Sequence, residues 1–269
     1  MMRSLWTAAS GMNAQQLNVD TISNNISNVN TSSYKKERLE FKSLLYQTME
    51  RASLDDADTG KPVNLQVGLG VKPIATSRMF TQGNMERTEN KTDLAIEGQG
   101  FFMIQTGEDE VSYTRDGNFK ISVGDGENNL VTAEGYYVLS TDGEPIAIPE
   151  NVAVKDITID ENGAISYMLD GEVQDLGVTI GVVQFANPQG LEAIGGNLYA
   201  TTQASGEPIL EEDGEVTRSK IAQGYIELSN VNIAEEMVNL IVAQRAYELN
   251  SKAITTSDEM LQQANNLKK

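Results

Sequence analysis

Two stretches with apolar residues at heptad spacing, one near each end of the chain, restrict its possible folds more than any other feature. In the first stretch the stripe runs without a skip through Leu5, Ala8, Met12, Gln15, Val19, Ile22, Ile26 and Val29. All but Gln15 are apolar, which is the pattern of an amphipathic helix with one buried seam. Ser4 is placed to be the N-cap, so the sequence predicts a helix from Leu5 to Asn30, about 39 Å long.

A second helix is predicted near the C-terminus, because no Gly or Pro occurs from Ile233 to Lys269. Asn232 with Glu235 forms a capping-box variant at its start. One stripe reads Ile233, Met237, Leu240, Gln244, Tyr247, Ser251, Ile254, Asp258 and Leu261. A second apolar set off this stripe comprises Val238, Ile241, Val242, Leu249 and Met260. A helix that is apolar on more than one face usually has more than one packing partner.

Between the two helical stretches the sequence has the texture of an all-β domain. Of the 23 glycines, 22 lie from Gly60 to Gly224. Turn signals rich in Asp and Gly separate short β-rich runs, among them FFMIQT, VSYTR, FKISV, GYYVLS, ITID, AISYML and VTIGVVQFA. Short strands joined by such turns are typical of an antiparallel sandwich or barrel. Residues 50–64 are polar and predict an exposed loop.

The chain is therefore predicted to be α+β, with N- and C-terminal α-helices pairing as a coiled coil and an inserted antiparallel all-β domain. We divide it into an N-terminal helix (1–33), a connecting segment with a polar insertion (34–67), a β-rich domain (68–224) and a C-terminal helix (225–269). Each helix needs a partner for its apolar stripe. Two interpretations stay open: an intramolecular stalk beneath one domain, or helices that drive self-assembly.

The composition argues against several classes of function. The chain has no cysteine and no histidine, so it lacks thiol chemistry, the usual general base and the commonest metal ligand. Its net charge of −19 lies almost entirely in residues 51–225, while both ends are nearly neutral. This acidic middle argues against a nucleic-acid partner. No apolar run approaches the ~20 residues that span a bilayer, and ordinary targeting signals predict a cytoplasmic protein without membrane insertion.

Motifs for catalysis or cofactor binding are incomplete. The glycine pairs in GLG (68–70) and EGQGFF (97–102) lack the third glycine and the following helix of a dinucleotide site. DENG (160–163) and GDGEN (124–128) do not continue into a calcium loop. We therefore predict no catalytic residue, no metal site and no cofactor, and we interpret Trp6 as a packing anchor rather than a ligand platform.

The stretch ISNNISNVN, from Ile22 to Asn30, carries helix-weakening asparagines where the first helix must end. Asn24, Asn25 and Asn28 lie beside the apolar seam. Their amides offer donors and acceptors that neighbouring helices can satisfy, which would fix the register of an assembly at some cost in stability.

These motifs together resemble the family of bacterial flagellar rod and hook proteins. The N-terminal hallmark of that family, Asn-Asn-Leu-Ala-Asn and then Thr-x-Gly-Phe/Tyr-Lys, is matched by NNISN (24–28) and by Thr31, Tyr34 and Lys35, with Ser33 where the family usually has glycine. Further similar motifs are DLAIEGQGFFMI (93–104), YTRDGNFKIS (113–122), LVTAEGYYVL (130–139), GGNLYATTQASGEP (195–208) and GYIELSNVNIAEEMVNLIVAQRAYELNSKAITTSDEML (224–261). Within the family, VGLGVKPIATSRMFTQGN (67–84) and the insertion before it are most similar to distal rod subunits, with proximal rod or hook-type subunits as the alternative.

The resemblance implies a structural subunit of the flagellar distal rod and no enzymatic activity. It implies export in the unfolded state by the flagellar type III apparatus, without a cleaved signal peptide. Copies would then assemble helically in the basal body, between other rod proteins and the hook protein. The terminal helices would line the export channel inside a rigid hollow shaft that transmits motor torque, with the β domain outside. A secreted glycan-binding module on a helical stalk is the alternative from another class.

The predicted assembly interface draws on both helices. Its residues are Leu5, Met12, Val19, Ile22, Asn24, Asn25, Ile26, Asn28, Val29, Ile233, Met237, Leu240, Gln244, Tyr247, Ile254 and Leu261.

Overall fold

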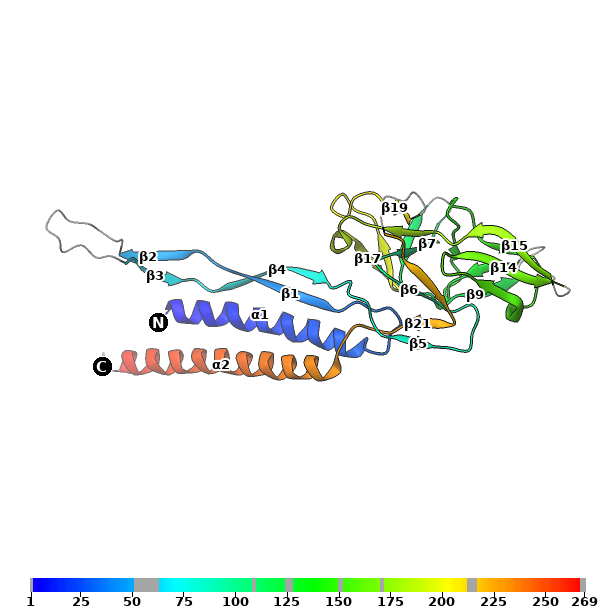
Figure 1. Cartoon of the computed structure of the whole chain (residues 1–269). Helices are drawn as coiled ribbons and strands as arrows, with labels where there is room; N and C mark the ends of the chain where they lie inside the picture. Colours follow the sequence, from blue (N-terminus) through cyan, green and yellow to red (C-terminus); the bar gives the residue numbers. More distant parts are fainter. Residues whose placement is uncertain are drawn as a thin grey trace. The chain divides into compact units, whose positions relative to one another are not determined.

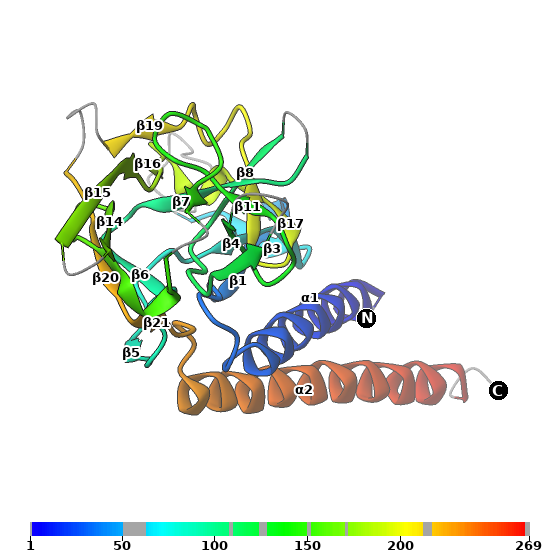
Figure 2. The same cartoon turned by 90° about the vertical axis from the view of Figure 1, so that its right-hand side faces the viewer.

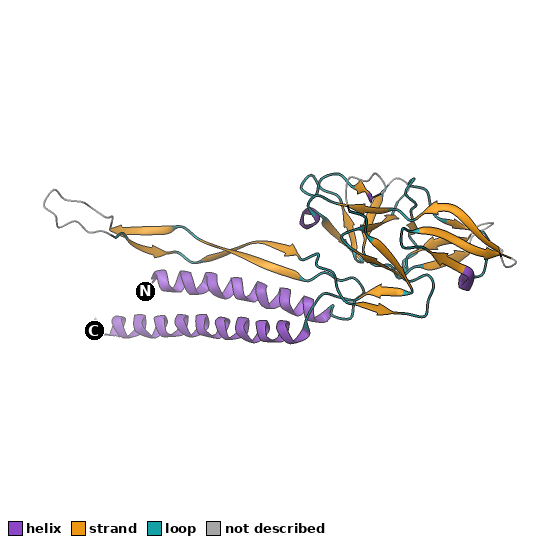
Figure 3. Ribbon diagram, viewed as in Figure 1, coloured by secondary structure: helices purple, strands orange, loops and turns teal. Residues whose placement is uncertain are grey.

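The computed structural model describes residues 2–50, 63–107, 110–123, 128–149, 152–169, 172–211 and 217–266. The described chain is α+β, with one long helix near each end and an antiparallel β body between them (Figure 3). Its residues group into two compact units. Unit 1 comprises Met1–Ser27, Glu37–Arg78 and Asn232–Lys269, and unit 2 comprises Asn28–Lys36 and Met79–Val231. The four-segment division of the sequence stays a prediction.

Unit 1 contains the two helices, α1 (Met2–Ser27) and α2 (Ile233–Asn266), which lie side by side and antiparallel (Figures 1 and 2). The start of α2 is as predicted, because the side-chain oxygen of Asn232 accepts a hydrogen bond from the N–H of Ala234 at 3.1 Å. The predicted bounds of α1 are wrong at both ends: Ser4 lies inside the helix, and the helix stops at Ser27. Asparagine and serine side chains compete with helical hydrogen bonds, which accounts for the early end.

Unit 1 also contains four strands that the sequence analysis did not assign. β1 (Glu37–Ser43) pairs antiparallel with β4 (Val71–Arg78), and β2 (Tyr46–Glu50) pairs with β3 (Leu65–Gly68). The two ladders follow each other along a two-stranded ribbon, of which β1 and β4 contact α1 (Figure 1). The predicted loop at 50–64 falls mainly on residues 51–62, which lie outside the described residues.

Unit 2 is built from short antiparallel strands. Its largest sheet has the order β12-β10-β11-β7-β8-β18-β17, with β9 beside β10 and β16 between β7 and β19. β13, β14 and β15 form a second sheet, and β20–β6 and β21–β5 are two further pairs. The bounds are β5 (Met85–Arg87), β6 (Leu94–Glu97), β7 (Phe101–Gln105), β8 (Val111–Thr114), β9 (Lys120–Val123), β10 (Asn128–Val131), β11 (Tyr137–Val138), β12 (Ala147–Ile148), β13 (Ile157–Ile159), β14 (Ala164–Leu169), β15 (Glu172–Thr179), β16 (Val182–Gln184), β17 (Glu192–Gly195), β18 (Leu198–Ala200), β19 (Ile209–Leu210), β20 (Lys220–Gln223) and β21 (Tyr225–Glu227). Two short 3-10 helices, η1 (Val154–Asp156) and η2 (Pro188–Gly190), complete the unit.

Strand β7 shows how the sequence builds the core of unit 2. Successive side chains of a strand point to opposite faces of its sheet. Phe102 and Ile104 enter the main apolar cluster, whereas Phe101 and Met103 join a second, aromatic cluster on the other face. The run FFMIQT can therefore be almost wholly apolar, because both of its faces are covered.

Most runs predicted as strands form strands, and one exception is informative. VTIGVVQFA, predicted as a single run, is divided at Gly181 between β15 and β16. A Cβ at residue 181 would lie 2.7 Å from the carbonyl oxygen of Ser140. Glycine is therefore required where the chain crosses this neighbouring backbone.

Candidate functional site

The seam between α1 and α2 is made of small and polar side chains. The hydroxyl oxygens of Ser4 and Ser257 lie 3.3 Å apart. A Cβ at Gly11 would lie 2.8 Å from Nδ2 of Asn250, so glycine lets the two helices approach closely there. Ala243 is buried seven residues before Asn250. This seam contains no large apolar side chain at these contacts, which leaves the larger ones for other partners.

Asn25 holds the start of α2 and the start of β1 to the end of α1. Its amide nitrogen donates to the backbone oxygen of Glu37 at 2.8 Å and to Oε2 of Glu236 at 3.1 Å. Its amide oxygen accepts from the N–H of Glu37 at 2.9 Å. Asn25 is 1% exposed. The structure thus engages this family-hallmark asparagine within the chain itself.

The predicted interface residues differ in exposure. Ile22 and Asn25 are buried. Leu5, Met12, Val19, Ile26, Leu240, Ile254 and Leu261 are partly buried in unit 1, and Asn28 and Val29 are partly buried in unit 2. Asn24, Ile233, Met237, Gln244 and Tyr247 are exposed. The structure describes one copy, so the interface between copies stays a prediction.

The residues of α2 that face α1 recur every seven positions, at Glu236, Ala243, Asn250 and Ser257. Each of them lies one position before a residue of the predicted stripe. Glu236 and Ala243 are buried, whereas Met237 and Gln244, which follow them, are exposed. No apolar pattern marks the register of Glu236, Ala243, Asn250 and Ser257, because only one of these residues is apolar. Sequence reasoning therefore missed this seam, and a strict spacing of seven between small and polar residues was the only available signal.

The second apolar set on α2 is uncovered in the chain. Val238, Ile241, Val242, Leu249 and Met260 are between 46% and 69% exposed. Burying one such side chain stabilises a protein by roughly 1.5–3 kcal/mol. This set is therefore available to a further partner, and the partner itself stays a prediction.

The part of the unit 1 ribbon that is formed by β2 and β3 is exposed almost throughout. Every residue of β2 is exposed, with Tyr46 at 59% and Met49 at 52%. On β3 and β4, Leu65 and Ile74 are 55% and 58% exposed. Two-stranded ribbons are marginal on their own in water. This surface is a second candidate for packing between copies, and the sequence analysis named none of these residues.

The hallmark segment Asn28–Lys36 belongs to unit 2 and has no regular secondary structure. Ser33 adopts a left-handed backbone with φ of 54°, where glycine is usually preferred. Its N–H donates to the carbonyl oxygen of Glu227 and its hydroxyl to that of Arg115, each at 2.8 Å. These bonds compensate for the strained conformation and explain how serine occupies the family's glycine position.

Three buried charges hold this segment in unit 2. Glu227 binds Nζ of Lys35 at 2.6 Å through Oε1 and Nε of Arg115 at 2.9 Å through Oε2. Its Oε1 also accepts from the N–H of Gly83 at 2.7 Å. All three charged side chains are at most 1% exposed. Arg115 donates further hydrogen bonds to backbone carbonyls of the loop before β7, including that of Gly98 at 2.9 Å.

Burial and charge act in opposite directions on this cluster. Burial, together with the nearby Arg115, lowers the pKa of Lys35 to about 8 against the opposing pull of Glu227. For Glu227, burial alone would raise the pKa, but Arg115 and Lys35 outweigh it and lower the pKa below its usual value. One carboxylate thus serves two cations, which makes Glu227 the residue on which the cluster depends.

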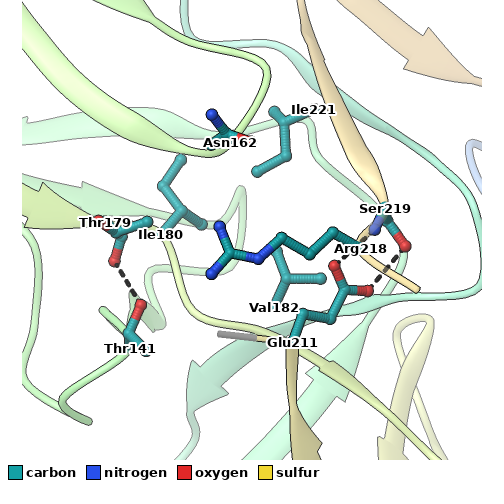
Figure 4. Close-up of a pocket in the computed structure, with 9 residues that line it drawn as sticks. All are labelled: Thr141, Asn162, Thr179, Ile180, Val182, Glu211, Arg218, Ser219 and Ile221. Atoms are coloured by element: carbon teal, nitrogen blue, oxygen red, sulfur yellow. Dashed lines mark hydrogen bonds between the residues drawn. The ribbon is translucent and has the colours of Figure 1, made fainter. Parts of the chain in front are cut away.

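A small pocket in unit 2 is structural rather than catalytic. It has a volume of about 40 Å³, room for about one water molecule and too little for a substrate. Figure 4 shows the Arg218 side chain lying across it and the carboxylate of Glu211 against Ser219. Glu211 accepts from both the N–H and the hydroxyl of Ser219 at 2.7 Å.

Within the described ranges, no group of three or more Asp, Glu, His or Cys side chains is arranged to hold a metal ion. Neither described helix is long and apolar enough to cross a membrane.

Comparisons with known proteins point to one family. The chain matches profiles described as flagella basal body rod protein at residues 5–35, flagellar hook protein FlgE/F/G D1 domain at 95–167 and flagellar basal body rod FlgEFG protein C-terminal at 222–267. It is 52% identical to the flagellar basal-body rod protein FlgG of Borreliella burgdorferi, over 100% of both chains. Identity to FlgG of Bacillus subtilis is 40% over 100% of both chains, and identity to the hook-basal body complex protein FlhP of that organism is 35% over 97% of both.

Proposed function

We propose how this chain works from one premise: it belongs to the family of flagellar basal-body rod and hook proteins, and it is a structural, non-enzymatic subunit of the flagellar rod. Its place is the flagellar basal body, where it assembles with other rod and hook proteins. The relatives of highest coverage are rod proteins of the FlgG type, which identifies the distal rod.

The central proposal is that copies of the chain form a helical polymer through unit 1. The observation that carries it is the uncovered apolar set on α2, because exposed side chains of this size are stabilised only when another surface covers them. α1 and α2 would pair as a coiled coil and pack against the helices of neighbouring copies. The predicted interface residues that α1 leaves exposed, such as Met237 and Tyr247, would be buried there.

The polymer would be a rigid, hollow drive shaft that carries torque from the motor to the hook. The helices of unit 1 would form its inner layer around the export channel, and the acidic unit 2 its outer layer. The exposed ribbon and the insertion near residues 47–66 would pack neighbouring copies into a straight, stiff tube. Apolar residues on both faces of the ribbon support this role.

Export would precede assembly. The subunit would pass through the flagellar type III apparatus in the unfolded state, without a cleaved signal peptide. A seam of small and polar residues between α1 and α2 supports this order, since it buries little apolar surface before other copies arrive.

The test is to locate the tagged protein by electron microscopy in purified basal bodies. We expect the tag along the rod, on the side nearer the hook. Labelling confined to the hook, or to the end of the rod nearer the membrane, would assign the chain to a different axial structure. Omission of the export apparatus should leave the protein inside the cell, and its appearance outside in such cells would refute the export step.

A further inference from the structure

The most exposed large aromatic residue of the chain lies on α1. Trp6 is the only tryptophan, and it is 74% exposed in unit 1. Arg3 lies one turn earlier on the same helix face and is also exposed, with its Nη1 donating to Sδ of Met49 at 3.0 Å. The residues that contribute most to protein interfaces are enriched in tryptophan, tyrosine and arginine. The exposed Trp6 side chain with the neighbouring Arg3 is therefore suited to a contact with another protein surface.

Unit 1 also carries a groove between its two helices. The groove has a volume of about 360 Å³ and is lined by Gln16 and Val19 of α1 and by Gln244, Tyr247 and Glu248 of α2. This volume lies within the roughly 300–1,000 Å³ range of pockets that enclose small organic groups. The groove therefore has room for one large aromatic side chain.

The chemistry of the groove complements that of the Trp6 face. Val19 and the ring of Tyr247 supply apolar surface, and Gln244 supplies a carbonyl oxygen for the indole N–H, which needs an acceptor when it is buried. Glu248 supplies a negative charge opposite the positive charge of Arg3. Glu248 now binds Arg245 at 2.8 Å, but both side chains are more than 60% exposed, and such pairs are readily exchanged.

We propose that Trp6 of one copy inserts into the α1–α2 groove of the next copy, with Arg3 beside Glu248. This inference rests on the proposed self-assembly and names the residues of one of its contacts. Trp6 and Val19 are thirteen residues apart on α1, about 20 Å along the helix axis. Because the inserted residue and the groove are different surfaces of the same chain, the contact is heterologous and repeats from copy to copy. A repeat of this kind builds an open helical polymer when its rotation does not close a ring.

Engineered cysteines test the contact directly, because the natural chain has none. Cells would make two tagged versions of the full chain together, one with Trp6→Cys and the other with Gln244→Cys. Mild oxidation of purified basal bodies should yield disulfide-linked dimers that carry both tags. The matched control pairs Trp6→Cys with Glu259→Cys, since Glu259 is exposed on α2, does not line the groove and belongs to neither apolar set of that helix.

Each outcome decides the proposal. Mixed-tag dimers with Gln244→Cys, at roughly tenfold or greater yield over the control, support it. Rods that form without this link, or that link Trp6→Cys equally to Glu259→Cys, overturn the contact but leave self-assembly standing. Wild-type chains that build no rod at all would refute the proposed function itself.

A second measurement covers the case in which a cysteine at residue 6 blocks assembly. Trp6→Phe keeps an aromatic ring and should retain rods, whereas Trp6→Ala should reduce their number at least tenfold at equal protein level. Both purified chains should keep wild-type helix content, because Trp6 makes little contact within the chain. Normal rods from Trp6→Ala would contradict the proposal.

Discussion

The two units of this chain differ in how far they bury their large apolar side chains. Unit 2 encloses an apolar core, an aromatic cluster and a three-residue charge cluster within its own strands. Unit 1 joins its helices partly through small and polar residues such as Ser4 and Ser257, and although it buries Ile22 it leaves several other large apolar side chains exposed. Unit 2 therefore buries its large apolar side chains within one copy, whereas unit 1 leaves several exposed, which is why we propose that copies associate through unit 1.

The largest effect is expected from replacing one large apolar side chain by alanine in each of the two units. Phe102 is fully buried, with its ring 5.1 Å from that of Phe119, so Phe102→Ala should lower the free energy of unfolding of the monomer by about 3–5 kcal/mol. Leu249 is 69% exposed, so Leu249→Ala should change it by less than about 0.5 kcal/mol. Urea denaturation of the purified chains measures both values.

Assembly should rank these two variants in the reverse order. Phe102→Ala protein that folds at low temperature should still form rods, whereas Leu249→Ala should form few. If Leu249→Ala destabilises the monomer as much as Phe102→Ala, unit 1 is already packed in one copy and the contrast between the units fails.

Removal of the carboxylate from the charge cluster is expected to be almost as costly. Glu227→Ala leaves Lys35 and Arg115 buried without their shared anion, which should cost unit 2 about 3–5 kcal/mol. Glu161→Ala is the matched control, since its pair with Lys220 is equally short at 2.7 Å but solvent-exposed. The control should unfold like the wild type. Equal effects of the two changes would mean that burial does not govern this cluster.

The sequence predicted those parts of the fold that have a regular residue pattern. Heptads located both helices, and Asp-Gly turns located the strands of unit 2. The ribbon was missed because β2 and β3 are exposed on both faces, so no alternation of buried and exposed residues marks them. The seam was missed because three of its four residues on α2, Glu236, Asn250 and Ser257, are polar.

The charge cluster could not be predicted for a different reason. Lys35 and Glu227 are separated by 192 positions in the chain, and their burial depends on how unit 2 closes. Charged residues normally lie on the surface, so the sequence alone predicts that Lys35, Arg115 and Glu227 are exposed to solvent. Asn25 was recognised as important, but its partners Glu37 and Glu236 emerge only when the chain folds back.

A smaller effect of about 3 kcal/mol is expected from pH, and it has an unusual sign. The folded chain releases the Lys35 proton near pH 8, whereas the unfolded chain holds it to about pH 10.5. Between these values the unfolded state binds more protons, so the stability of unit 2 should rise with pH. Denaturation at pH 7, 8, 9 and 10 measures this, and Lys35→Met should remove the rise. If the stability of the wild type falls across this pH range, and that of Lys35→Met falls in the same way, Lys35 does not titrate in this range and the prediction is wrong.

The smallest effect concerns the left-handed turn at Ser33. Ser33→Ala should destabilise unit 2 by about 1 kcal/mol, because it removes the hydroxyl bond to the Arg115 carbonyl and keeps the strained φ. Ser33→Gly removes the same bond but also relieves a strain of about 1 kcal/mol, so its stability should return close to that of the wild type. The difference between the two variants in urea denaturation isolates the backbone strain, since both lack the side-chain bond. The helix content of unit 1 serves as the internal control and should stay constant, because Ser33 bonds only within unit 2. Equal stability of the alanine and glycine variants would show that the turn carries no strain, and the family's usual glycine at this position would then need another physical reason.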